Sequence, residues 1–359
     1  MENTKFRKWL EEMNLDHPLV IAGPCSAETE EQVLEVAHEL KNTDATIFRA
    51  GVWKPRTRPG TFEGNGVRAL PWMQRVKKET GLLTAIEIAN AHHAKLALDF
   101  DIDVLWIGAR TTVNPFAVQE IAEAIRDTDK IVLVKNPINP DLALWIGAIE
   151  RFFKMGVKNL GAIHRGFSSF RPSKYRNIPS WQIAIDLKTK YPDLPIFNDP
   201  SHITGNRDLI QEVSQTALDL KFDGLMIETH CTPDKAWSDA AQQITPARLK
   251  EIIKDLRVRK PRFEKEEYIA RLNAIRQEIN AKDDELLETL SERMELVHNI
   301  GIAKKESNVA VLQSTRWNEI LEKVVIKGQE QGLSRDFIEK IFKAIHQESI
   351  RHQERIING

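Results

Sequence analysis

Eight short apolar runs rich in β-branched residues recur between residues 19 and 230, and each is followed by a polar turn and a longer segment with helical spacing. Near-continuous apolar strands that alternate with helices are typical of a parallel sheet covered on both faces. Eight repeats favour a closed (β/α)8 TIM barrel over an open doubly wound sheet. The runs are LVIAG from Leu19, TIFRAG from Thr46, LTAIEI from Leu83, VLWIG from Val104, IVLVKN from Ile131, NLGAIHRG from Asn159, PIFNDPS from Pro195 and GLMIETH from Gly224.

The chain, with 359 residues, is too long for a barrel alone, since barrels reach about 250 residues. We therefore predict a barrel over residues 1–257, closed by a helix over 245–258. A charged, proline-interrupted linker follows over 258–265, and an all-α domain occupies 266–359. The first strand begins so near the start that we expect no regulatory domain before the barrel.

The C-terminal segment from 266 to 307 contains no proline and a single glycine, Gly301, and its apolar residues recur at helical spacing. A helix of about 40 residues would extend about 60 Å, longer than a small domain, so it must pack against something beyond its own short chain. Two further helices are expected over 314–332 and 334–357, the second with Ser334 as N-cap. We predict a three-helix domain that forms an intertwined homodimer.

The overall charge and the cysteine count exclude several classes of protein. A net charge of -1 provides no general field for nucleic acid. The only cysteines, Cys25 and Cys231, form no disulfide framework, which favours a reducing compartment. The first 18 residues are rich in charged side chains and lack the apolar run of a signal peptide. No segment approaches the roughly 18 apolar residues of a membrane span. We expect a cytoplasmic protein that binds neither nucleic acid nor membrane.

Cationic residues follow the predicted strands at their carboxyl ends, where the active site of a (β/α)8 barrel lies. Such a concentration of positive charge in a nearly neutral protein indicates a site for polyanions. Phosphate is the expected ligand, because arginine matches its oxygens and lysine supplies a point charge. The six residues are Arg49, Lys54, Arg56, Arg110, Lys135 and Arg165.

A second group at the strand ends combines the usual donors to a first-row divalent metal ion: a thiol, an imidazole and carboxylates. These residues follow strands one, seven and eight, which are neighbours once the barrel closes. The mixture favours Mn, Fe, Co or Zn over Mg or Ca. The candidates are Cys25, His202, Glu228 and Asp239, with Asp234 as a rival carboxylate.

The strings IAGPCS, FRAGVWKPRT, GAR, NDPSH and IETH followed by SD make residues 1–255 similar to 3-deoxy-D-arabino-heptulosonate 7-phosphate (DAHP) synthase. The combination of KPRT, GPCS and DPSH is specific for this family, which condenses phosphoenolpyruvate with erythrose 4-phosphate. The nearest rival is a related phosphoenolpyruvate-dependent aldol synthase that makes an eight-carbon sugar acid. It shares the barrel and a GPC-type first loop, but the KPRT string argues against it.

The resemblance implies three sets of site residues. One divalent ion per barrel, with Mn favoured, would be bound by Cys25, His202, Glu228 and Asp239. Asp239 is preferred to Asp234 because the family's aspartate lies in an SD pair eleven residues after the glutamate. Phosphoenolpyruvate would be bound by Arg49, Lys54, Ala109, Arg110, Lys135 and Arg165. Erythrose 4-phosphate would be bound by Lys54, Pro55, Arg56 and Thr57.

The expected reaction begins as the metal polarises the aldehyde of erythrose 4-phosphate and the enol carbon of phosphoenolpyruvate attacks it. Water then adds to the cationic C2, and inorganic phosphate leaves. We expect Lys54 to donate a proton to the developing alkoxide and Glu87 to orient the water.

The helical segment holds another group of cations. Arg293 and Lys304 are eleven residues apart, about three turns, so they share one face of the long helix. Arg276, seventeen residues before Arg293, is turned about 100° from that face and is expected to serve a site on a partner chain. Ser349 and Gln353 align on the last helix. Lysines and arginines on helices are commonly solvated, so a dimerisation arm is the alternative interpretation.

The strings LNAIRQEINAKDDELLETLSERMELV, GIAKK and FKAIHQESIRHQ make the chain from about Tyr268 similar to the all-helical chorismate mutase family. The resemblance implies that Arg276 of the partner and Arg293 bind the carboxylates of chorismate, and that Lys304 and Gln353 bond its ether oxygen. Additional contacts would come from Arg316 and Ser349. The rearrangement to prephenate needs only the compact conformer and stabilised charge on that oxygen.

Two positions depart from the mutase pattern. Trp317 stands where many members have a glutamate, and Gln313 replaces an acidic residue of some relatives, so the substrate hydroxyl loses a partner.

Together, the two resemblances predict a bifunctional shikimate-pathway enzyme with feedback inhibition through the C-terminal domain. The alternative is a domain that mainly binds chorismate or prephenate, regulates the barrel and dimerises, with weak mutase activity.

Overall fold

The computed structural model describes residues 5–54, 60–170, 172–260, 265–312 and 314–358. The chain divides into two compact units, residues 1–261 and 262–359. Among the described residues, none of the helices is both long enough and apolar enough to span a membrane.

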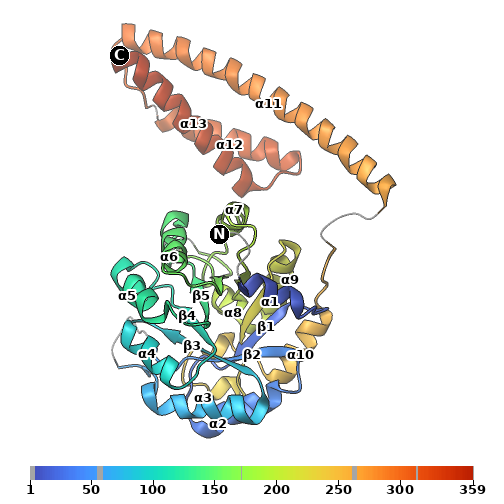
Figure 1. Ribbon diagram of the computed structural model, residues 1–359. Coiled ribbons are helices and arrows are strands. Elements are labelled where there is room, and N and C mark those ends of the chain that lie inside the picture. Colours follow the sequence, from blue (N-terminus) through green and yellow to red (C-terminus); the bar gives the residue numbers. More distant parts are fainter. Residues whose placement is uncertain (1–4, 55–59, 171, 261–264, 313, 359) are drawn as a thin grey trace. The chain divides into compact units, whose positions relative to one another are not determined.

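Eight parallel strands close into a barrel in chain order, and β8 pairs with β1 (Figure 1). The predicted (β/α)8 barrel is therefore confirmed. Most strand residues are buried, which explains why their sequences lack an apolar and polar alternation. The strands are β1 (Leu19–Gly23), β2 (Ala45–Ala50), β3 (Leu83–Ile88), β4 (Val104–Ile107), β5 (Ile131–Lys135), β6 (Leu160–His164), β7 (Ile196–Asn198) and β8 (Gly224–Glu228).

Helices surround the barrel, and several begin at a side chain that accepts from a backbone N–H, as Asn114 and Asp141 do. The closing helix begins after Thr245 and ends at Asp255, three residues before the predicted end, because Leu256 is already extended. The helices are α1 (Lys5–Glu12), α2 (Glu30–Leu40), α3 (Leu70–Thr80), α4 (Ala91–Asp99), α5 (Pro115–Ile125), α6 (Leu142–Lys154), α7 (Trp181–Lys190), α8 (Pro200–Thr204), α9 (Ile210–Asp219) and α10 (Pro246–Asp255).

Helix α1, which the strand pattern did not predict, packs at the amino end of the barrel. Its Phe6 is 1% exposed and stacks on Trp9 and on Phe197 of β7, with ring centroids 5.6 Å and 5.8 Å apart. Phe6 thus joins the apolar cluster inside the barrel, which also contains Trp106 and Met226. This packing covers the end of the barrel opposite to the strand ends that carry the predicted site.

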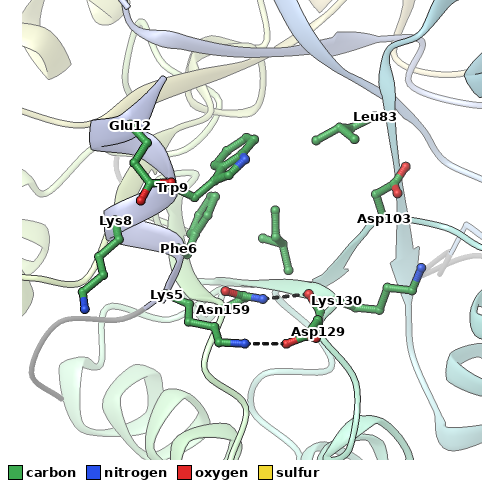
Figure 2. Close-up of a pocket in the computed structure, with 11 residues that line it drawn as sticks. Lys5, Phe6, Lys8, Trp9, Glu12, Leu83, Asp103, Asp129, Lys130 and Asn159 are labelled. Atoms are coloured by element: carbon green, nitrogen blue, oxygen red, sulfur yellow. Dashed lines mark hydrogen bonds and ion pairs between the residues drawn. The ribbon is translucent and has the colours of Figure 1, made fainter. Parts of the chain in front are cut away.

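A hollow of 580 Å³ remains beside α1 at this end, and Figure 2 shows Phe6 and Trp9 projecting from α1 toward it. Two of its lysines pair with carboxylates: Lys5 lies 2.9 Å from Asp129, and Lys130 lies 2.6 Å from Asp101. Because three lysines and three carboxylates line the hollow, it does not concentrate positive charge for a phosphate, although it is larger than the cavity at the opposite end.

The C-terminal unit contains three helices, as predicted: α11 (Glu266–Glu306), α12 (Ser314–Glu330) and α13 (Arg335–Asn358). The hydroxyl of Ser334 accepts from the N–H of Phe337, which confirms the predicted N-cap. Helix α13 packs on both α11 and α12. A Cβ at Gly301 of α11 would lie 2.8 Å from the terminal methyl group of Ile356 on α13, so that side chain would have to move to make room for it.

Candidate active sites of the barrel and the helical unit

A cavity of 360 Å³ opens at the carboxyl ends of the barrel strands. Three residues predicted from the sequence lie outside the described part of the chain: Pro55, Arg56 and Thr57. The cavity brings together eight of the others, contributed by several strand ends. They are Lys54, Glu87, Ala109, Arg110, Lys135, Arg165, His202 and Asp239.

Three predicted metal donors lie next to this cavity. One ligand atom each from Cys25, Glu228 and Asp239 lies within 4.8 Å of the other two. The Sγ of Cys25 is 3.4 Å from a carboxylate oxygen of Asp239, and the Nζ of Lys54 donates to the same sulfur at 2.9 Å. The rival Asp234 instead pairs with Arg207 at 2.8 Å, and its side chain is 83% exposed. The structure thus places Asp239 beside Cys25.

The fourth predicted donor, His202, is held by a carboxylate that the sequence did not single out. Its Nδ1 lies 2.8 Å from Asp199, and its Nε2 faces Glu228 at 3.8 Å. Asp199 also caps α8 and accepts from Lys135 at 2.9 Å. A carboxylate behind an imidazole commonly fixes the orientation of a metal ligand. The Nε2 of His202 is therefore the atom directed at the Glu228 side of the metal donors.

The electrostatics of these donors fit a divalent cation. Burial raises the pKa of Cys25 to about 12, and Glu228 and Asp239 add to the shift against the opposing charge of Lys54. Burial also works to raise the pKa of Asp239, but Arg176, His202 and Lys54 outweigh it and hold that pKa below its usual value. A thiol and two carboxylates in one buried place attract a cation, which would favour the thiolate.

Arg49 is not on the cavity wall, although it was predicted to bind phosphoenolpyruvate. Its side chain is 2% exposed and donates to the carboxylate of Glu228 at 2.8 Å. Its guanidinium also lies 4.8 Å from the centre of the Trp106 ring. The buried pair orients a candidate metal donor, and a direct contact between Arg49 and a substrate remains a prediction.

The cationic wall of the cavity includes Arg165, whose Nη1 donates to Asn177 at 2.8 Å. Its backbone N–H donates to Asn136 at 2.6 Å, which orients the residue after β6. Burial lowers the pKa of Arg165 to about 10. The negative charge of Asp199 opposes this shift, whereas the positive charges of Arg176 and Arg110 add to it. An anion in the cavity would relieve this unfavourable burial of charge.

Arg176 and Asn177 also line the cavity, although no pattern in the sequence marked them. Arg176 donates to Asp239 at 3.0 Å and to Gln242 at 2.8 Å. Both residues lie in the long connection between β6 and α7, well beyond the strand end. No strand-end motif marks them, so only the path of this connection brings them to the cavity.

In the helical unit, α11 and α13 bring four of the predicted residues into one region. Arg293 donates to the hydroxyl of Ser349 at 2.7 Å, and Lys304 donates to the carbonyl of Val311 at 2.5 Å. Gln353 is buried; its amide nitrogen donates to the carbonyl of Ser349 at 3.3 Å. Its amide oxygen has no partner among the described residues.

Two predicted cations of the helical unit lie on its surface. Arg276 is exposed on the N-terminal half of α11, as expected for a residue that serves a partner chain. Arg316 is also exposed and pairs with Glu319 at 3.2 Å on α12. Gln313 lies outside the described residues.

Comparisons with known proteins match both parts of the chain. The family model of the DAHP synthetase I family matches residues 13–260, and that of chorismate mutase type II matches residues 275–354. A phospho-2-dehydro-3-deoxyheptonate aldolase of Thermotoga maritima is 29% identical, over 66% of this chain and 68% of its own length. A 2-dehydro-3-deoxyphosphooctonate aldolase of a Bradyrhizobium species is 25% identical, over 66% and 86%.

Solved structures give the same result for the barrel. The crystal structure of the Thermotoga maritima DAHP synthase has a TM-score of 0.61 and 28% identity, and the match covers 66% of this chain and 67% of that one. Both resemblances drawn from the sequence are confirmed, and the two families indicate a synthase and a mutase in one polypeptide. The chain therefore belongs to the DAHP synthetase I family and carries a chorismate mutase type II domain after its barrel.

Proposed function

We propose that the barrel catalyses a metal-dependent condensation of phosphoenolpyruvate with erythrose 4-phosphate, which yields DAHP and inorganic phosphate. The observation that carries this proposal is the position of Lys54. It lines the anion cavity, and its Nζ lies 2.9 Å from the sulfur of Cys25. Lys54 therefore connects the metal donors to the cationic wall, where the two substrates would meet.

A bound divalent ion, with Mn favoured among Mn, Fe, Co and Zn, would polarise the aldehyde carbonyl of erythrose 4-phosphate. Arg110, Lys135 and Arg165 would hold the phosphate and carboxylate of phosphoenolpyruvate through charge-assisted hydrogen bonds. On the basis of the KPRT string, Lys54-Pro55-Arg56-Thr57, we assign the binding of erythrose 4-phosphate to these four residues. Arg56 and Thr57 would bind its phosphate.

Lys54 suits the role of proton donor to the new alkoxide. Burial works to lower its pKa, but the interactions with Cys25 and Glu228 outweigh burial and raise that pKa above its usual value. The amine therefore carries a proton at neutral pH. Glu87 accepts from the indole N–H of Trp106 at 3.0 Å, which holds its carboxylate in the cavity to orient the attacking water.

The decisive experiment measures phosphate release from phosphoenolpyruvate plus erythrose 4-phosphate, with and without a chelator. We expect release that stops with the chelator and returns with Mn²⁺. Arabinose 5-phosphate replaces erythrose 4-phosphate in a parallel reaction, because some relatives are named as phosphooctonate aldolases. A preference for the five-carbon sugar would refute the substrate assignment, and full activity under chelation would refute the role of the metal.

For the helical unit we propose the rearrangement of chorismate to prephenate in a homodimer. Arg293, Lys304, Ser349 and Gln353 would contact the substrate from one protomer, and Arg276 of the other would complete the site. The proposal is supported by the exposed apolar side chains of the N-terminal half of α11. They include Tyr268, Ile269, Ile275, Ile279, Leu286 and Leu287, each at least 41% exposed. A second copy of this helix is the expected cover.

Feedback is the second function proposed for the helical unit. Because Trp317 occupies the place of a glutamate, the domain is also suited to bind chorismate or prephenate as a regulator with weak mutase activity. The test compares the aldol rate with and without prephenate, in the full chain and in a chain ending at residue 260. Inhibition of the full chain alone supports regulation. An aldol rate of the full chain that does not change on addition of prephenate would refute regulation.

The two cysteines are free thiols in the described structure. We propose a cytoplasmic location, because Cys25 must remain reduced to bind a metal ion. Exposure of the purified enzyme to an oxidant should therefore remove its activity unless a thiol reductant restores it.

A further inference from the structure

His346 belongs to the candidate site of the helical unit, although no sequence motif marked it. It lies three residues before Ser349 and seven before Gln353 on α13, so all three share one face of that helix. The half-buried imidazole stacks on the ring of Trp317 from α12, with centroids 3.9 Å apart and planes 8° apart. Stacking fixes the plane of the imidazole and leaves both nitrogens at its edge.

The surroundings of His346 keep this ring neutral. Burial lowers its pKa, and the charges of Arg293 and Lys304 on α11 lower it further. A neutral imidazole carries one N–H donor and one acceptor nitrogen. Within the described part of the chain, these nitrogens have no hydrogen-bond partner. The site thus contains a hydrogen-bonding group that is neither cationic nor used by the fold.

We propose that His346 is a specificity-determining residue that hydrogen-bonds the hydroxyl group of the ligand in the helical site. This inference rests on the proposed binding of chorismate or prephenate, negatively charged ligands that suit the cations Arg293 and Lys304 of α11. A hydroxyl group both donates and accepts, as a neutral imidazole does. Trp317 offers only its indole N–H, which is a donor, so it cannot accept a hydrogen bond from this hydroxyl.

The first test separates recognition from packing by two substitutions. His346→Phe keeps an aromatic ring against Trp317 but removes both nitrogens, and we expect kcat/KM for chorismate to fall about tenfold or more at an unchanged melting temperature. His346→Gln keeps polar atoms at a similar reach and should recover most of the loss. His352→Phe, on the same helix, is the matched control and should retain wild-type kinetics. Wild-type kinetics of His346→Phe would overturn the inference.

The second test identifies the ligand group. An analogue of chorismate without the ring hydroxyl should bind the wild type and His346→Phe equally well, whereas chorismate should bind the variant about tenfold more weakly. Equal weakening for both ligands would show that His346 only packs. If the wild type binds chorismate or prephenate without turnover, the same comparison is made on dissociation constants. Failure of the wild type to bind either ligand refutes the proposed function itself, and this inference falls with it.

Discussion

Lys54 is the residue on which the proposed barrel chemistry depends most directly, because it reaches both the sulfur of Cys25 and the cavity with the cationic wall. Replacing it with methionine keeps much of the side-chain volume and removes the proton donor. We expect Lys54→Met to lower turnover by about 100-fold or more, the usual worth of a general acid, while metal binding is retained. Phosphate release and metal content of the purified variant measure the two effects.

Lys95→Met is the matched control for this substitution, because Lys95 is an exposed lysine on α4. It should keep wild-type turnover. Wild-type turnover in Lys54→Met itself would remove Lys54 from the mechanism. Loss of the metal ion in that variant would instead assign the lysine to the metal site.

His164, at the end of β6, is a buried residue that neither lines the cavity nor binds the proposed metal. One ring nitrogen bonds the carbonyl of Pro179 at 2.6 Å, and the other lies 3.1 Å from the amide nitrogen of Asn198. A neutral ring satisfies both, donating to Pro179 and accepting from Asn198. Burial, assisted by the charge of Arg165, lowers the pKa of His164 from 6.5 to about 4 despite the bond to Pro179.

This shift predicts a pH-dependent stability of the barrel. In the unfolded chain His164 becomes protonated below pH 6.5, whereas in the folded chain it becomes protonated only below about pH 4. The free energy of unfolding should therefore fall as the pH falls from 6.5 to 4, by about 2 kcal/mol between pH 7 and pH 5. Urea unfolding followed by tryptophan fluorescence measures it, because seven of the eight tryptophans precede residue 260.

Substitution isolates the contribution of His164 from that of the carboxylates. In His164→Gln the decrease in the free energy of unfolding between pH 7 and pH 5 should be about 2 kcal/mol smaller than in the wild type, whatever the stability of the variant at pH 7. His38→Gln removes an exposed histidine and should leave the dependence as it is in the wild type. An unchanged pH dependence in His164→Gln would contradict the assignment.

The connections after β1 and β8 are joined to each other around the metal donors. The hydroxyls of Ser26 and Ser238 lie 2.5 Å apart, and a carboxylate oxygen of Glu28 accepts from the backbone N–H of Trp237 at 2.7 Å. The other oxygen of Glu28 lies 3.4 Å from His230, and both side chains are buried. Asp239, which follows Ser238, has a positive φ of 45°, a conformation that its surroundings must hold.

We therefore expect Glu28 to determine metal affinity without touching the metal ion. Glu28→Ala leaves the N–H of Trp237 and the ring of His230 without the Glu28 carboxylate, and the loop that carries Asp239 loses one of its anchors. The concentration of Mn²⁺ that restores half of the aldol activity after treatment with a chelator should rise about tenfold or more. This is the usual effect of losing a residue that supports a metal ligand. Glu28→Gln retains an acceptor for Trp237 and should show a smaller rise.

Glu31→Ala provides the control, since Glu31 is exposed on α2 a few residues further along the same connection. It should leave the metal requirement unchanged. A wild-type requirement in Glu28→Ala would mean that the two connections hold their positions without this carboxylate.

In the proposed homodimer, the long helix α11 carries the surface between the two copies of the chain. Ile279 is 53% exposed in the single chain, on the half of the helix that carries Arg276. Ile279→Glu would place a carboxylate in the proposed dimer core, where burial of a charge is unfavourable. We expect a monomer by light scattering and a loss of mutase activity of roughly 100-fold, because Arg276 of the partner would no longer complete the site. The aldol rate should stay within about twofold of the wild type.

Gln277→Glu, two residues before Ile279 and about 200° around α11 from it, introduces the same carboxylate at an exposed polar position on the other side of the helix. It should remain dimeric and active as a mutase. A dimeric Ile279→Glu variant, or a monomer with full mutase activity, would refute the intertwined arrangement.

Local patterns in the sequence were sufficient to predict the barrel strands, the three C-terminal helices and most of the cations at the cavity. These features depend on periodicity and on the rule that parallel strands present their carboxyl ends at one rim, so a linear pattern contains them. The cap at Ser334 was predictable for the same reason, because it involves neighbours in the chain.

Tertiary structure alone decided which side chains meet across the cavity. Arg49 lies in a buried pair with Glu228, Lys135 pairs with Asp199, and Arg176 reaches Asp239 from a long connection. Helix α1 covers the amino end of the barrel, and His346 meets Trp317 across two helices. Each of these contacts joins residues whose spacing in the chain has no period, so their partners follow from the path of the folded chain and from competition for buried hydrogen bonds.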